Sequence, residues 1–187
     1  MSDLEPLIGE PLALDLVNTR PVDADLLATP DQLAAWVTRQ SDRLAEPPPT
    51  LFDEADLAAV HAVRDHTAAA LAALLHGRRP PATAVDGLVA AQSVAPAIRV
   101  LDWDGTAFVA TSTRVGPAGV RLAAALAEAA VDLLTDPAIT KLKCCAADDC
   151  VMLFLPAHPR RQWCSPARCG NRARVARYYQ RHKPATN

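Results

Sequence analysis

The sequence predicts an α+β protein: a predominantly α-helical N-terminal domain over residues 1–140, with one β-hairpin, followed by a small cysteine-rich module over 141–187. Apolar residues recur at helical spacing through most of the first part. Strict alternation replaces that spacing in one stretch near residue 105. All five cysteines lie between Cys144 and Cys169. A chain of 187 residues can bury one good core and leave room for a minor module.

Helices are predicted from caps, apolar spacing and helix-breaking residues. Thr29 and Pro30 suit the N-cap and the first position of a helix. Asp53 opens an acidic turn that favours the N-terminal end of a helix dipole. The segment over 11–20 mixes apolar and polar residues, so a short helix and a buried turn both remain open. The other helices are expected at about 30–41, 53–76, 82–94 and 118–134.

One stretch carries the pattern of a β-hairpin. Residues 98–103 and 107–111 alternate in polarity on either side of Asp104-Gly105. An Asp-Gly pair between two alternating segments is the strongest short-range hairpin signal. We therefore expect two antiparallel strands there.

The net charge of −2 conceals an asymmetry between the two parts of the chain. Residues 141–187 hold ten Lys and Arg against two Asp, which makes +8 and leaves −10 for residues 1–140. A strongly basic end favours a polyanionic partner, most often nucleic acid. A solvated charged tail is the alternative interpretation.

Neither a membrane span nor a secretory signal is recognisable. No stretch reaches the roughly 18 uncharged apolar residues that a span requires, and the N-terminus lacks a basic flank followed by an apolar run. We therefore expect a soluble cytoplasmic protein with no membrane partner. Disulfides are rare in that reducing compartment, so clustered cysteines favour metal binding.

Four of the cysteines form two pairs with the same internal spacing. Cys145 and Cys150 are separated by four residues, as are Cys164 and Cys169, and thirteen residues lie between the pairs. Tetrahedral Zn²⁺ takes two thiolates from each of two such turns. Using Cys144 instead of Cys145 would break the match, so Cys144 is interpreted as a spare. An all-cysteine set indicates one structural zinc ion, whereas buried or free thiols are the alternative.

A basic helix is predicted after Cys169. At helical spacing its apolar side carries Val175 with Tyr178 or Tyr179, and this side can pack on the zinc knuckles. Another side can face a partner. Because the second ligand pair stands at the start of this helix, the module is expected to be a treble-clef-like zinc finger. The basic side carries Arg174, Arg177 and Arg181.

Two segments carry a resemblance to known families. Cys169-Gly-Asn-Arg172, preceded by Trp163-Cys164-Ser165, resembles the CGNR zinc finger of bacterial proteins. Leu14-Asp-Leu-Val-Asn-Thr19 resembles the L-D-F-x-N-T segment that opens the companion ABATE domain, and Leu33-Ala-Ala-Trp36 fits its next block. The loop over 154–159 is shorter than the family pattern. Proteins of this family are described as stress-induced transcription regulators, so the resemblance implies DNA binding by the finger and a regulatory larger domain.

The leading hypothesis is a DNA-binding transcription regulator linked to the stress response. Its arginines, Arg177 and Arg181 among them, would contact phosphates first. Arg168, Arg172 and Arg174, near the helix start, are best placed to reach base edges in a groove of double-stranded DNA. The alternative is a zinc-stabilised protein- or RNA-binding module, because a fold does not determine a function.

An enzyme is the least supported interpretation. His61 and His66 are five residues apart, which suits no shared metal, and no phosphate loop, HExxH motif or nucleophile elbow occurs. Asp15 and Asn18 are interpreted as a buried hydrogen-bonding pair, and they are also the best candidates for a ligand pocket. Such a pocket would take a small-molecule or protein effector on the N-terminal domain. A homodimer suits a regulator, although no heptad seam supports it.

Overall fold

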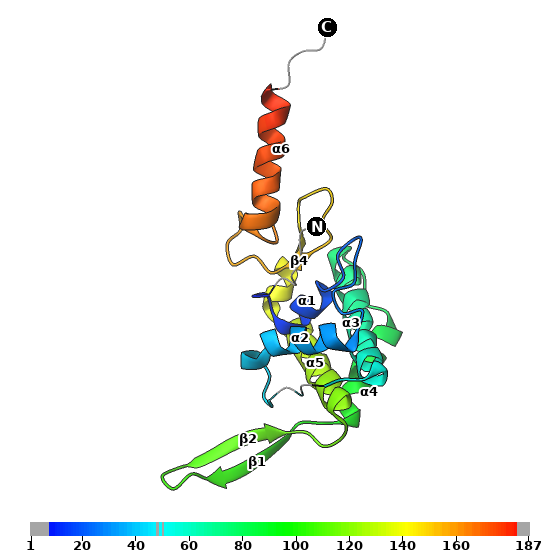
Figure 1. Cartoon of the computed structure of the whole chain (residues 1–187), viewed down its shortest axis with the longest axis vertical. Coiled ribbons are helices and arrows are strands. Elements are labelled where there is room, and N and C mark those ends of the chain that lie inside the picture. The colour runs from blue at the N-terminus through cyan, green and yellow to red at the C-terminus, as the bar shows by residue number, and fades with distance from the viewer. Residues whose placement is uncertain (1–7, 48, 50, 183–187) are drawn as a thin grey trace.

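The computed structural model describes residues 8–47, 49 and 51–182, so the outer ends of the two predicted domains, 1–7 and 183–187, lie outside the described residues. A helical body occupies the centre of the molecule, with a hairpin arm at one end and a helix-tipped module at the other (Figure 1). The helices of the body are α1 (Leu12–Val17), α2 (Pro30–Arg39), the short 3-10 turn η1 (Ser41–Arg43), α3 (Glu54–Leu75), α4 (Ala82–Val94) and α5 (Ala118–Thr135).

The helices begin where the sequence supplies caps. The Thr29 side chain accepts a hydrogen bond from the backbone N–H of Gln32, and Pro30 takes the first helical position. Asp53 and Asp56 form a capping box at the start of α3, each side chain accepting from the other's backbone N–H. The segment at 11–20, left open above, forms the helix α1. The predicted helix positions are confirmed to within about two residues.

The core lies where α5 packs against α1, α3 and α4. Alanines on α5 are fully buried, and their small side chains let the neighbouring helices approach closely. Trp36 of α2 and Leu14 of α1 cover the same core, each with at most 1% of its surface exposed. The side of α3 that faces this core buries Leu57, Val60, Val63, Thr67 and Leu71.

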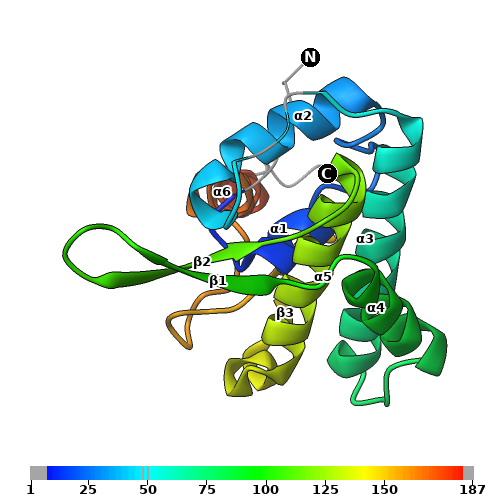
Figure 2. The same ribbon diagram turned by 90° about the horizontal axis from the view of Figure 1, so that it is seen from below.

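The predicted hairpin consists of β1 (Ile98–Trp103) and β2 (Phe108–Thr113), paired antiparallel from Ile98 opposite Thr113 to Trp103 opposite Phe108. Its loop has four residues because the Asp104 carboxylate accepts hydrogen bonds from the N–H groups of Thr106 and Ala107. These bonds also hold the pKa of Asp104 below its usual value. Every residue of β1 is exposed, and the hairpin stands away from the helices as an arm (Figures 1 and 2).

The C-terminal module shares one strand with the helical body. Leu153 of β4 belongs to the core of the body, whereas the next residue, Phe154, is fully buried in a separate small core with Cys145, Met152 and Cys169. In the described part of the chain, no helix is long and apolar enough to cross a membrane. The elements of the module are η2 (Pro137–Lys141), β3 (Lys143–Cys144), β4 (Leu153–Phe154), the π-helical turn η3 (Pro166–Gly170) and α6 (Asn171–His182).

Candidate metal centre and basic helix

Two tight turns present the four predicted cysteines to one another. In the first turn, between β3 and β4, the Cys145 N–H donates to the Met152 carbonyl oxygen and closes the loop that contains Cys150. In the second, the Ser165 side chain accepts from the backbone N–H of Arg168, which starts η3 and positions Cys169. The last ligand pair therefore stands directly before α6, as the treble-clef-like prediction requires.

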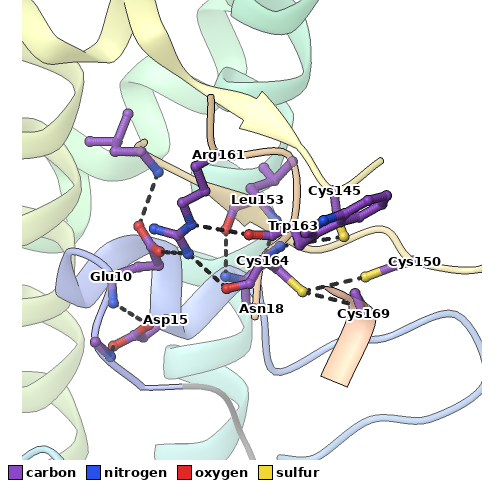
Figure 3. Close-up of polar contacts among 12 residues, drawn as sticks. Glu10, Asp15, Asn18, Cys145, Cys150, Leu153, Arg161, Trp163, Cys164 and Cys169 are labelled. Carbon is purple, nitrogen blue, oxygen red and sulfur yellow. Dashed lines mark hydrogen bonds and ion pairs between the residues drawn. The ribbon is translucent and has the colours of Figure 1, made fainter. Parts of the chain in front are cut away.

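The four sulfur atoms fit a tetrahedral metal. All four Sγ atoms lie within 4.8 Å of one another, with 3.8 Å between Cys150 and Cys164 and 3.6 Å between Cys164 and Cys169 (Figure 3). Zn–S bonds of about 2.3 Å give tetrahedron edges of about 3.8 Å. A disulfide would need an S–S distance of about 2.05 Å. Among the described residues, this is the one group of metal-binding side chains brought together in this way.

The pKa shifts of the thiols show that ionising all four cysteines is unfavourable unless a cation lies among them. Burial raises the pKa of Cys150 to about 12 and raises that of Cys164 still further, and neighbouring cysteine sulfurs add to both shifts. Burial also opposes ionisation of Cys145, but hydrogen bonds from the N–H groups of Cys164 and Ala147 outweigh it and lower the pKa of this thiol. Four thiolates this close repel one another unless a divalent cation lies among them. Among the described residues the group consists of four cysteines and no further ligand, so the site holds one structural Zn²⁺ ion.

Cys144 stands apart from this cluster. Its exposed sulfur lies 3.9 Å from the Cys150 carbonyl oxygen and outside the four-sulfur group. The pKa of its thiol is raised by partial burial and by the adjacent Cys145. The structure therefore separates Cys144 from the other four, as the spacing predicted.

Polar side chains just outside the two ends of α1 dock the module onto the body. The Asn18 amide donates to the Leu153 carbonyl oxygen and accepts from the Leu153 N–H, both at 2.8 Å. Glu10 accepts from the Leu155 N–H at 3.0 Å and from the Arg161 guanidinium at 2.6 Å. Arg161 in turn donates to the Cys164 carbonyl oxygen at 2.7 Å, so the contact reaches the metal centre (Figure 3).

Asp15 and Asn18 are both buried, but they bond to different partners rather than to each other. The Asp15 carboxylate accepts from the N–H groups of Gly9 and Glu10 and from Arg43 at 2.6 Å. Burial raises the pKa of Asp15 despite the guanidinium beside it. Asn18 also lines a cavity of about 120 Å³ next to the metal centre. A ligand-binding role for these two residues stays a prediction.

Glu10 and Arg161 form an ion pair between the body and the finger that the sequence did not predict. They are separated by 151 residues, and neither lies in a recognisable motif. The histidines noted above take ordinary structural roles: His61 lies 2.7 Å from the Leu27 carbonyl oxygen, and His66 packs beside Gly87.

The five candidate arginines lie in three different surroundings. Arg172 donates to the Cys169 sulfur at 3.4 Å and pairs with Asp149 at 2.8 Å, so it belongs to the surroundings of the metal. Arg168 lies on η3 and is exposed. On α6, the other three are within about 60° of one another and roughly opposite Arg172, at 100° per residue. We call them the arginine stripe: Arg174, Arg177 and Arg181.

The apolar side of α6 does not pack on the zinc knuckles, contrary to the prediction. Val175, Tyr178 and Tyr179 are 54%, 57% and 69% exposed. Trp163 takes the place expected of them: a Cβ on Gly170 would stand only 3.2 Å from its ring. Helix α6 leaves the module and points away from the body (Figure 1).

The fold and the site define a two-part class of protein: a helical body joined to a four-cysteine zinc finger, with a helix directly after the last zinc ligand. The family described as "Putative stress-induced transcription regulator", the ABATE family, matches residues 10–137, and the CGNR zinc finger matches residues 141–182. The chain therefore belongs to the ABATE family and carries a CGNR zinc finger, which confirms the resemblance. A search of curated proteins finds no match to this chain.

Proposed function

We propose that this protein is a transcription regulator whose zinc finger binds double-stranded DNA, and that it acts by binding rather than by catalysis. The proposal includes its place in a reducing cytoplasm, where thiolates stay available to zinc, and a link to the stress response. The family description supports the regulatory role. The observation that carries DNA binding is the arginine stripe on a helix that stands free of the body.

The stripe has the charge and the access that a phosphate backbone requires. Helix α6 contains four arginines and no acidic residue, and every described α6 side chain except the half-buried Ala173 is exposed. A helix is about 10–12 Å in diameter with its side chains, so α6 fits a major groove about 12 Å wide and, at twelve residues, follows it for about 18 Å. In this arrangement Arg174, Arg177 and Arg181 contact phosphates, which supply sequence-independent affinity.

Base recognition falls mainly to residues at the start of the helix. Arg168 and Arg174 are exposed there, and arginine reads guanine by two parallel hydrogen bonds. Arg172 was predicted to share this role. Arg172 bonds to the Cys169 sulfur and pairs with Asp149, so it would have to break the ion pair with Asp149 before it could contact a base. In this proposal its main role is therefore to position the helix on the metal centre.

A salt titration of DNA binding by fluorescence anisotropy tests the proposal. Each phosphate contact contributes a slope of about −0.9 to log K against log salt, so changing Arg174, Arg177 and Arg181 together to Ala should flatten the slope by roughly two to three units. The matched control removes the same charge elsewhere, by changing the exposed Arg78, Arg79 and Arg99 to Ala. If the two triple variants flatten the salt slope equally, the net charge of the protein and not the arginine stripe determines DNA binding, and the proposal is wrong.

The second candidate function is a protein- or RNA-binding module, and the exposed apolar side of α6 favours it. Val175, Tyr178 and Tyr179 present a surface that phosphate binding alone does not use. Changing both tyrosines to Ser should leave the salt slope on duplex DNA unchanged. Absence of salt-sensitive binding to any duplex, together with binding to RNA or to a protein partner, would replace the DNA proposal. An effector on the helical domain and a homodimer stay predictions.

A further inference from the structure

A cavity of about 200 Å³ lies in the helical body, at the foot of the hairpin arm. One wall is the face of α5 that carries Leu122 and Ala125, and Leu12 and Leu44 face it from the N-terminal part of the body. The metal centre, the arginine stripe, Asp15 and Asn18 do not line it. We call this space the α5 cavity.

One cation at the edge of this apolar wall retains hydrogen-bonding capacity. Arg121 is about one third exposed, and its Nε lies 3.2 Å from a Glu46 carboxylate oxygen without making a hydrogen bond. Its Nη1 donates to the Gly116 carbonyl oxygen at 3.0 Å. A guanidinium offers five N–H donors. The two N–H donors of Arg121 Nη2 make no hydrogen bond to any of the described residues.

The other two arginines of the cavity are already committed. Arg43 donates to Asp15, Gln40 and the Glu10 carbonyl oxygen, and Arg114 bonds to Glu128 and to the Ala95 carbonyl oxygen. Arg121 is therefore the cation best able to take an added anion. The exposed carboxylate of Asp132 stands eleven residues further along α5, about 16 Å away, so it repels an anion only weakly at the Arg121 end.

The size and polarity of the α5 cavity define the ligand class. At roughly 30 Å³ for each group the size of a water molecule, the space of about 200 Å³ holds about seven such groups. One anionic head at Arg121 leaves a short unbranched chain to cover Leu122 and Ala125. We propose that the α5 cavity binds a small monocarboxylic acid of about four to six carbons, with its carboxylate on Arg121 and its chain along α5.

Bound ligand would act on the hairpin arm through Glu46. This carboxylate accepts a hydrogen bond from the Arg114 backbone N–H at the foot of β2 and also pairs with Arg121. A ligand carboxylate on Arg121 competes with Glu46 for the same guanidinium. Binding in the cavity is thereby coupled to the segment that carries the arm, independently of whether the finger binds DNA.

Calorimetric titration of the intact zinc-loaded protein with hexanoate tests this proposal. Saturable one-to-one binding is expected, and Arg121→Gln should weaken it about tenfold or more through loss of a charge-assisted hydrogen bond. Arg78→Gln, an exposed arginine far from the cavity, is the matched control. Hexylamine should bind more weakly than hexanoate, because its ammonium repels Arg121 and cannot accept a hydrogen bond from it.

A second variant keeps the test decisive if Arg121→Gln disturbs folding. Ala125→Leu leaves the guanidinium in place and fills the apolar wall, so it should abolish hexanoate binding while circular dichroism stays unchanged. Three outcomes would overturn the proposal: no saturable binding in the millimolar range, equal binding of hexylamine, or unchanged binding to folded Arg121→Gln and Ala125→Leu variants.

Discussion

Replacing Asn18 by Ala tests whether the contact between helix α1 and strand β4 joins the two parts of the molecule. The Asn18 amide makes two hydrogen bonds of 2.8 Å to the backbone of Leu153, and both residues are buried. The variant leaves the Leu153 N–H and carbonyl oxygen without these partners. Each net hydrogen bond contributes about 1 kcal/mol, and a buried polar group left unpaired costs about 1–3 kcal/mol. We expect the free energy of unfolding to fall by about 2–4 kcal/mol.

Urea denaturation followed by far-ultraviolet circular dichroism measures this loss. The midpoint should move to lower urea, with little change in slope if unfolding stays two-state. Gln92→Ala is the matched control, since this amide bonds only within its own helix, to the Leu88 carbonyl oxygen, and should change stability by less than about 0.5 kcal/mol. A loss below about 1 kcal/mol for Asn18→Ala would refute the reasoning that this amide holds β4 in the body.

Four further outcomes are expected. Metal analysis should find zinc retained in Cys144→Ser and lost in Cys145→Ser, and the reverse would show that the ligand set is wrong. Partial burial raises the pKa of Asp25, but two hydrogen bonds from Arg64, one from the Leu27 N–H and the charge of Arg64 together outweigh it and hold this pKa below its usual value. Their stabilisation should be present above about pH 4 and lost as pH falls through the folded-state pKa, a loss that Asp25→Asn should remove from acid titrations. Chelating zinc should preserve most of the helical circular dichroism while lowering the unfolding midpoint, and collapse of that signal would contradict a separate helical domain. Leu101→Ser, on the exposed arm, should leave the melting temperature nearly unchanged.

Local sequence signals were sufficient for the metal ligands and for every predicted helix except α1, whose segment stayed open between a helix and a turn. Caps such as Thr29 and Asp53 act within three or four residues, so their effect is visible in a short window of sequence. Cysteine spacing is equally local, because each pair is held by one tight turn. The hairpin was also predicted, but its loop covers residues 104–107, one residue more than the predicted strand ends left, since the Asp104 side chain bonds to the N–H groups of Thr106 and Ala107.

Long-range contacts had no such signal. Asn18 and Leu153 are 135 residues apart, and Glu10 and Arg161 are 151 apart, so no periodicity connects them. Asn18 was expected to be buried, and it is, but burial of an amide does not name its partner. The exposure of the hairpin arm was likewise invisible, because alternating apolar residues indicate a half-buried strand and only tertiary packing decides what covers it.

Strand β4 explains how a finger with so small a core acquires a defined place on the body. Successive side chains of a strand point to opposite faces, so Leu153 enters the core of the body while Phe154 enters the core of the finger. The Arg161 guanidinium lies 4.4 Å above the Phe154 ring and pairs with Glu10, which adds a cation–π contact to the same junction. Glu10, which lies just before α1, bonds to Arg161, and Arg161 bonds to the Cys164 carbonyl oxygen. The body therefore contacts the turn that supplies the second ligand pair, and this turn leads directly into α6.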